Sequence, residues 1–243
     1  MLKRIILLTL VLTALLSCKK DEPETGTLKI NFLVEGSDGL AELPFLSEDI
    51  NGVPMRIELL KIYFAKIAVK NSEGSASTLS DIELLDYSGA NRSRSFTINS
   101  GSYASLDFIL GIDEVQNASD PVSFDDTHPL SAAQNMYWTW ASKYIFFKIE
   151  GRADTTFENL FNHLFIYHVG TDDLSRPISN MPASFVIEGG KTTEINLVLD
   201  LNAALSDPSQ GVDVATESLT HTLDNVPLAA RIADVMSKAF RVE

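Results

Sequence analysis

Apolar and polar residues alternate along several short stretches of this chain. In residues 28–34 every second position is apolar, which is typical of a strand that buries one face. Similar stretches recur along the sequence and are separated by clusters of Gly, Pro, Asn and Asp. The other stretches that we expect to form strands are residues 82–87, 95–98, 103–110, 144–150 and 164–169. This arrangement predicts an all-β fold, an antiparallel Ig-like β-sandwich.

Two further stretches indicate how neighbouring strands are joined. Residues 57–69 change the phase of their apolar positions after Leu59, which indicates a β-bulge or two separate strands. The dipeptide Gly189-Gly190 lies between two alternating stretches. It predicts a β-hairpin that spans residues 184–201.

The C-terminal part of the chain follows a different period. Apolar residues recur at helical spacing over residues 228–239, after Asp224 or Asn225 as the helix cap. We therefore expect one amphipathic helix that packs on the sandwich, and a long loop at residues 36–52. The sequence shows no internal repeat, so it predicts a single folded domain over residues 27–243.

The first eighteen residues look like the signal of a bacterial lipoprotein. Two basic residues precede an apolar run at residues 5–16, which is shorter than the about 20 residues that a membrane-spanning helix needs. The run ends at Cys18, the only cysteine of the chain. The alternative is an ordinary signal peptide, or a buried helix that happens to contain a Cys. We expect residues 1–17 to be removed, Cys18 to be lipidated, and residues 18–26 to form a flexible tether.

Lipidation at Cys18 would place the folded domain outside the cytoplasm. We expect a lipid anchor in the outer membrane, with the domain on its periplasmic or its cell-surface face. No thiol would remain in the fold, which excludes disulfides, cysteine nucleophiles and thiolate metal sites. The full chain carries a formal net charge of −14, and so acidic a protein repels nucleic acid.

The sequence contains no motif of a catalytic site. G-x-S-x-G, H-E-x-x-H and a phosphate-binding glycine loop are all absent, so we do not expect an enzyme. Asp113, Glu114, Asn117 and Asp120 form an oxygen-rich group of the kind that binds Ca²⁺. Asp and Asn are also ordinary turn residues, however, and the spacing is not that of an EF-hand.

The least ordinary segment of the sequence lies between residues 128 and 140. Trp138 and Trp140, the only tryptophans, are two residues apart and would share one face of an extended chain. His128 lies ten residues before Trp138. On composition alone, the interpretation that we favour is an aromatic pair in a sandwich core.

The order of several segments resembles the MbnP family of extracytoplasmic copper-binding proteins, which are known from methanotrophs and are common as lipoproteins in Bacteroidetes. The resemblance covers roughly residues 27–200. The segments that carry it are LKIYFAKI at 60–67, residues 82–87, residues 101–117, MYWTW at 136–140, KIEG at 148–151 and FIYHVG at 165–170. No single segment is decisive, but their shared order and spacing argue against chance.

The resemblance implies a β-sandwich that binds one copper ion through His side chains, close to a tryptophan. In studied members of the family, a partner di-haem enzyme of the cytochrome c peroxidase type oxidises this tryptophan to kynurenine. Carried over to this chain, His168 and His128 are the candidate copper ligands, and Trp138 and Trp140 are the candidates for oxidation. Imidazole suits copper, which also binds more tightly than other divalent ions of the first transition row.

The chain departs from the family pattern at one position that concerns this site. Some relatives carry a His where this chain has Ile145. His163 and His221 could complete the ligand set, but we set His163 aside because it lies five residues before His168, on the opposite face of an extended chain. We therefore expect a membrane-anchored copper-binding lipoprotein. The alternative is a surface lipoprotein that binds a glycan or a protein without a metal, with the tryptophans as a stacking platform.

Overall fold

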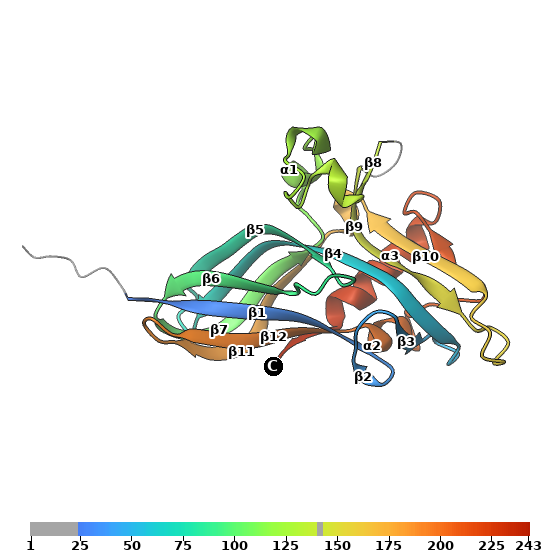
Figure 1. Cartoon of the computed structure of the whole chain (residues 1–243), viewed down its shortest axis with the longest axis horizontal. Coiled ribbons are helices and arrows are strands. Elements are labelled where there is room, and N and C mark those ends of the chain that lie inside the picture. The colour runs from blue at the N-terminus through green and yellow to red at the C-terminus, as the bar shows by residue number, and fades with distance from the viewer. Residues whose placement is uncertain (1–23, 140–142) are drawn as a thin grey trace, which may run out of the picture.

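The computed structural model describes residues 24–139 and 143–243. The predicted signal peptide, Cys18 and Trp140 lie outside these described residues, as does most of the predicted tether. Within the described part of the chain, no helix has both the length and the apolar character that crossing a membrane requires. Figure 1 shows two β-sheets that lie against each other along the long axis of the molecule, with helices at their flanks.

The smaller sheet is built around the first strand of the domain, which was predicted at residues 28–34. This strand, β1 (Thr25–Gly36), pairs in parallel with β12 on one edge and antiparallel with β6 on the other. The strands of this sheet are β14 (Phe240–Val242), β12 (Thr192–Asp200), β1 and β2 (Gly39–Leu40) in that order, with β6 (Ser93–Asn99) also paired to β1.

The larger sheet carries the long strand β4 (Pro54–Asn71) in its middle. Its strand order is β11 (Arg176–Ile187), β7 (Gly101–Leu110), β4, β9 (Lys143–Ala153), β10 (His163–Gly170) and β13 (Leu219–Thr220). Three more strands are attached to it, β3 (Phe45–Glu48) and β5 (Ala76–Asp86) on β4, and β8 (Tyr137–Trp138) on β9. The strands that alternation predicts at residues 82–87, 103–110, 144–150 and 164–169 are confirmed in this sheet.

The phase change predicted in residues 57–69 is a β-bulge within one continuous strand. The register of β4 against β9 shifts between Ile57 and Leu59. Ile57 and Leu60 are both fully buried although they are three residues apart. One extra residue at the bulge restores the core-facing phase over Leu60, Ile62 and Phe64. A second register shift, against β7, follows between Ala65 and Ala68.

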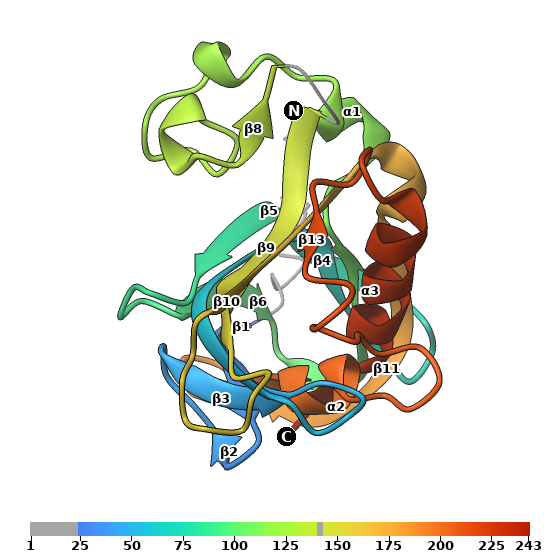
Figure 2. The same ribbon diagram turned by 90° about the vertical axis from the view of Figure 1, so that its right-hand side faces the viewer.

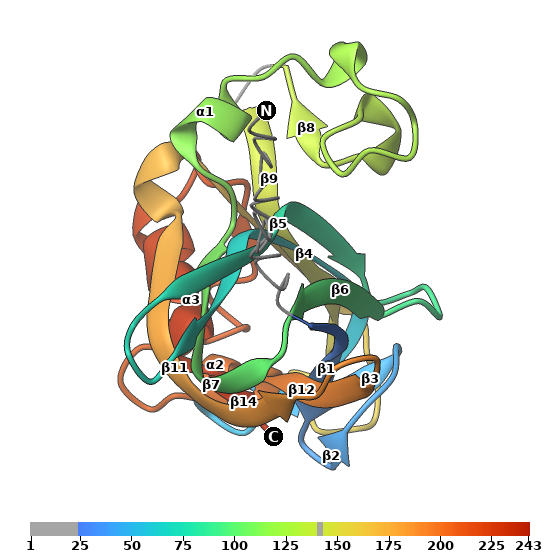
Figure 3. The same ribbon diagram turned by 90° about the vertical axis from the view of Figure 1, so that its left-hand side faces the viewer.

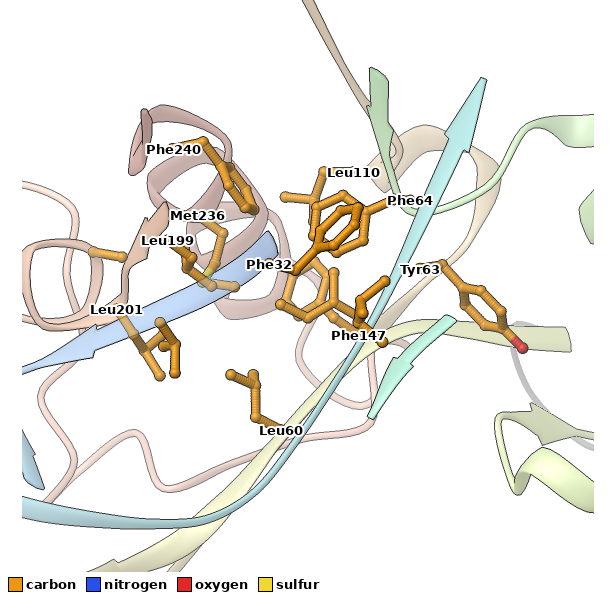
Figure 4. Packing of buried hydrophobic residues seen from close by; sticks show 14 of the residues in the cluster. Phe32, Leu60, Tyr63, Phe64, Leu110, Phe147, Leu199, Leu201, Met236 and Phe240 are labelled. Atoms are coloured by element: carbon orange, nitrogen blue, oxygen red, sulfur yellow. The ribbon is translucent and has the colours of Figure 1, made fainter. Parts of the chain in front are cut away.

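The hydrophobic core lies between the two sheets and is rich in aromatic rings. Phe64 of β4 packs against Phe32 of β1 with ring centroids 5.0 Å apart, and against Phe240 of β14 at 5.7 Å. Figure 4 shows these three rings together and Tyr63 on the opposite side of β4. Burial of each such phenyl ring contributes about 1.5–3 kcal/mol, so Phe64 helps to hold the two sheets together.

The predicted C-terminal helix is confirmed as α3 (Val226–Lys238). Asn225 caps it, because its side chain accepts a hydrogen bond from the backbone N–H of Leu228 at 3.3 Å. The apolar side of α3 packs on β10 and β11, as Figure 2 shows. Asp224, the other predicted cap, bonds to His221 instead. Two shorter helices are α2 (Leu201–Leu205) and the 3₁₀ helix η3 (Asp172–Leu174).

The hairpin predicted over residues 184–201 is wrong. The turn at Gly189-Gly190 is present, with a φ of +69° at Gly190, but it joins strands of different sheets. β11 pairs with β7, whereas β12 pairs with β1. A short turn in the sequence indicates that the chain reverses its direction locally. It does not indicate which strand each flanking strand pairs with.

Both sheets are mixed, which corrects the expectation of purely antiparallel pairing. β1 and β12 are parallel over residues 27–35 and 192–200, and β10 and β13 are also parallel. Parallel partners far apart in sequence leave no local signal. The predicted loop at residues 36–52 contains β2 and β3, the latter paired with the start of β4. The all-β, sandwich-like fold class is confirmed.

Residues 111–139, which we call the insertion, leave the larger sheet between β7 and β9. The Tyr63 hydroxyl donates to the carbonyl of Pro129 at 2.6 Å, and the Tyr144 hydroxyl donates to the carbonyl of Leu130 at 2.8 Å. The insertion therefore covers the outer face of β4 and β9, and Figure 3 shows it rising above the sheets beside β9. Its elements are α1 (Glu114–Asn117), the 3₁₀ helices η1 (Pro121–Ser123) and η2 (Ala132–Gln134), and β8.

Candidate metal centre

Three aromatic side chains from separate parts of the sequence meet at the edge of the larger sheet. The ring centroids of Trp138 and His168 are 5.4 Å apart, and those of Trp138 and His221 are 5.8 Å apart. The two imidazole rings are 5.3 Å apart and nearly perpendicular. We call these three residues the ring cluster.

The order of the strands explains why these residues meet. β8 pairs with β9, β9 with β10, and β10 with β13, so Trp138, His168 and the segment after β13 are neighbours. Thr222 fixes that segment. Its hydroxyl donates to the His168 carbonyl and accepts from the Gly170 backbone N–H, both at 2.9 Å. His221 is thereby held beside β10.

His168 is bonded on one nitrogen and open on the other. Its Nε2 lies 2.6 Å from Oε1 of Glu150. Its Nδ1 is buried and has no hydrogen-bond partner in the described part of the chain. A buried polar atom without a partner is costly and calls for an explanation, such as an ion that it binds.

The buried position of His168 favours its neutral form. Burial lowers the pKa of His168, and the hydrogen bond to Glu150 opposes this without reversing it. The same hydrogen bond lowers the pKa of Glu150. A neutral imidazole that donates its Nε2–H to a carboxylate keeps a free lone pair on Nδ1, which is the form that binds a metal.

His221 is held in a matching way by Asp224. Its Nδ1 is 3.0 Å from Oδ2 of Asp224, and its backbone N–H donates to Oδ1 at 2.6 Å. Burial works to raise the pKa of Asp224, but the hydrogen bonds from His221 outweigh it and the pKa is lowered. With Nδ1–H donated to this carboxylate, Nε2 of His221 is the nitrogen left to bind a ligand.

The two histidines have the surroundings typical of metal ligands. A metal-bound His usually donates its other N–H to a carboxylate, which fixes the tautomer and the ring orientation. Imidazole nitrogens bind ions such as Zn²⁺ at about 2 Å. Two imidazole rings with centroids 5.3 Å apart therefore suit one ion bound between them. The described residues contain no group of three or more His, Cys, Asp and Glu side chains placed to bind a metal. The ring cluster therefore offers two imidazole ligands.

Comparison with known proteins assigns the chain to a family. The family model of MbnP matches residues 24–224. The chain belongs to the MbnP family. Its structure is similar to that of MbnP from Methylosinus trichosporium, with a TM-score of 0.60 and 14% identity over 90% of this chain and 98% of that chain. At this identity the structural match supports the fold alone, and no curated protein matches the sequence.

The structure of this MbnP-family chain places His128 apart from the ring cluster. The His128 ring stacks on Phe124, with centroids 4.2 Å apart, and its Nδ1 accepts the backbone N–H of Leu130 at 3.0 Å. It lines a cavity of about 600 Å³ beside residues 80–84 of β5. The two histidines predicted as ligands are thus not brought together, and a copper-binding role of His128 stays a prediction without support from its neighbours.

His221 was not predicted as a main ligand from the sequence. Asp224 lies three residues after it and was predicted only as a possible helix cap. Its pairing with the His221 ring was therefore missed. His163, which was set aside, bonds through Nε2 to the Val214 carbonyl at 3.1 Å. Ile145, at the position where some relatives have a His, is buried in the hydrophobic core.

The glycan-binding alternative needs an exposed tryptophan, and Trp138 is only half-exposed. It lies against both imidazole rings of the ring cluster and packs on the hydrophobic core. Trp140, the other candidate for oxidation, lies outside the described residues. The structure therefore places one of the two predicted tryptophans at the candidate site.

The oxygen-rich group proposed for Ca²⁺ caps helices instead. Asp113 accepts the backbone N–H of Gln116 at 2.8 Å and closes a capping box on α1. Asp120 accepts the backbone N–H of Val122 at 3.2 Å at the start of η1. These roles account for both carboxylates by the ordinary preference of Asp for helix N-termini.

Proposed function

We propose that this chain is an extracytoplasmic copper-binding lipoprotein that binds one copper ion between His168 and His221, beside Trp138. The observation that carries the proposal is the buried, unpartnered Nδ1 of His168 next to a second imidazole. Glu150 and Asp224 orient the two rings. We propose a binding role, without catalysis by the chain itself.

The donor set supports copper over other metals. A site of imidazole nitrogens binds copper more tightly than the other divalent ions of the first transition row. Zinc sites usually have at least three protein ligands, and the described residues provide no such group. A bound copper ion would add one-electron redox chemistry to this site.

Trp138 is the residue that we propose for oxidation, because it contacts both copper-binding rings. A partner di-haem enzyme of the cytochrome c peroxidase type would use two molecules of peroxide. Opening of the indole C2–C3 bond would give N-formylkynurenine and two waters, and hydrolysis would then release formate and leave kynurenine. The half-exposed position of Trp138 leaves it accessible to such an enzyme.

The position of the chain start supports an anchored protein with an accessible site. Figure 1 shows β1 beginning at one end of the long axis, whereas β8 and β10 lie in the other half of the molecule. Trp138 is in β8 and His168 is in β10. A lipid on Cys18, a few residues before β1, would hold the first end at the outer membrane. The copper-binding site would then lie far from the anchored end of the domain.

The test is a copper titration of the mature chain with Cys18→Ser, which keeps it soluble. We expect one copper ion per chain, and a loss of affinity in both His168→Ala and His221→Ala. His128→Ala and His163→Ala are matched controls that should bind like the parent. Unchanged binding in the first two variants, or loss of binding in His128→Ala, would reject this site.

A further inference from the structure

Lys148 lies on the outer face of β9, the strand that pairs with both β8 and β10. In the register of the sheet it is directly opposite His168 of β10. Its ammonium donates to the carbonyl of Asn135 at 2.5 Å, three residues before Trp138. Glu150, the carboxylate that bonds His168, is two residues further along β9 and therefore on the same face. One side chain thus connects the insertion to the strand that carries the His168–Glu150 pair.

The environment of Lys148 differs from that of its neighbour Lys61. The two lysines are opposite each other in the register of β4 and β9. The Lys61 ammonium forms an ion pair with Asp86 at 2.8 Å, and its longer contact is with the Gln134 carbonyl at 3.5 Å. Lys148 forms no ion pair within the described residues, and Glu150 acts on it only as a more distant charge.

An ammonium group that is partly removed from water without an ion pair is unfavourable for folding. A neutral side chain of the same length would pack on β9 without this cost. The charge of Lys148 therefore points to a use outside folding, and His168, its register partner on β10, has an open Nδ1.

The bond to Asn135 controls the entry of the chain into β8. Asn135 ends η2 in the left-handed conformation, with a φ of 57° and a ψ of 36°. The chain then runs through Met136 into β8, where Trp138 pairs with Lys143 of β9. Fixing the Asn135 carbonyl thus fixes the start of the short segment that holds Trp138 against His168.

We propose that Lys148 is a positioning residue that holds Trp138 against His168, and that its positive charge makes the centre favour a monovalent ion over a divalent one. This proposal rests on the copper-binding function proposed above. Glu150 and Asp224 attract any cation that enters the ring cluster. A fixed positive charge repels a divalent ion twice as strongly as a monovalent ion at the same place, so Lys148 shifts the balance toward Cu⁺.

The experiment compares Lys148→Met with Lys148→Arg, which keeps the charge, and with Lys61→Met as the matched control. All variants carry Cys18→Ser for solubility and Trp140→Phe, so that Trp138 is the only tryptophan. The first measurement is acrylamide quenching of Trp138 fluorescence in the metal-free protein. The second is the ratio of the affinities for Cu⁺ and Zn²⁺, each measured by competition with a chelator. Lys148→Gln replaces Lys148→Met if the latter does not fold.

We expect stronger quenching of Trp138 in Lys148→Met and a Cu⁺ to Zn²⁺ affinity ratio that falls on the order of tenfold. Lys148→Arg and Lys61→Met should match the parent in both measurements. Parent-like quenching in Lys148→Met would overturn the positioning role, and an unchanged ratio, or an equal change in Lys61→Met, would overturn the charge effect. A parent that binds no Cu⁺, or a His168→Ala variant that binds it normally, would instead reject the proposed function.

Discussion

The two faces of β9 carry different kinds of side chains. On the face toward the core, Ile145, Phe147 and Ile149 are at most 1% exposed and pack between the sheets. On the outer face, Lys148 and Glu150 are partly exposed and make polar contacts with the insertion and with His168. The core face stabilises the folded strand, whereas Lys148 and Glu150 on the outer face contact the insertion and the candidate site.

This difference shows why stability and function are separable in this protein. Substitutions on the core face should change the free energy of unfolding and leave the geometry of the ring cluster intact in the folded molecules. Substitutions of Lys148 or Glu150 on the outer face should change metal binding with little effect on folding. Three variants or conditions test this separation.

The largest expected effect is on stability, from Phe147→Ala. Phe147 is fully buried, and Figure 4 shows it among the core side chains near Phe32. Truncation of a buried phenyl ring lowers the free energy of unfolding by about 3–5 kcal/mol. Urea unfolding measures this loss. The folded fraction should still bind one copper ion per chain, and a loss of binding in that fraction would show that the two faces are not separable.

A smaller effect, now on binding, is expected from Glu150→Gln. Removal of a carboxylate that orients a metal-bound His costs about 10–100-fold in metal affinity, whereas the unfolding midpoint should change little. Glu83→Gln is the matched control, because Glu83 pairs with Arg94 beside the cavity that His128 lines. Competition titrations with a copper chelator measure both variants. A loss of copper affinity in Glu83→Gln as large as in Glu150→Gln would indicate that copper binds near His128 instead.

The smallest effect is a pH dependence of the stability of the metal-free protein. The folded state lowers the pKa of His168 below 6.5, so the unfolded chain takes up this proton first as the pH falls. Stability should therefore decrease as the pH drops through about 6.5. The lowered pKa of Glu150 adds a further decrease as the pH drops through about 4.5.

Unfolding by urea at a series of pH values measures this dependence. His168→Gln should remove the decrease near pH 6.5 and weaken the one at lower pH, because the hydrogen bond from His168 is the main cause of the lowered pKa of Glu150. A parent protein whose stability increases on acidification through this range would contradict the neutral, buried state of His168.

Much of the fold could be predicted because burial leaves a local pattern. The alternation in residues 28–34 and 144–150 and the phase change in β4 all reflect side chains that face one core. The parallel pairing of β1 with β12 could not be predicted, since the partners are far apart in sequence. The hairpin predicted at Gly189-Gly190 was wrong for the same reason. The pairing of β11 with β7 and of β12 with β1 depends on contacts outside the turn.

The candidate site was predicted only in part. His168 and Trp138 were found through the order of family segments, and the structure brings their rings together. His221 was missed as a main candidate because β13, which places it beside β10, has only two residues and no periodicity. His128 was favoured for its closeness in sequence to Trp138, but the fold of the insertion stacks it on Phe124.

X-ray absorption spectroscopy of the copper-loaded chain and of its His168→Ala/His221→Ala double variant tests the proposed copper site most directly. We expect one copper ion per chain with imidazole scattering from two nitrogen ligands, at about the 2 Å typical of such bonds. The double variant should retain no stoichiometric copper, whereas a His128→Ala/His163→Ala control should keep the parent spectrum. Stoichiometric copper with the same spectrum in the His168→Ala/His221→Ala variant would contradict this copper site.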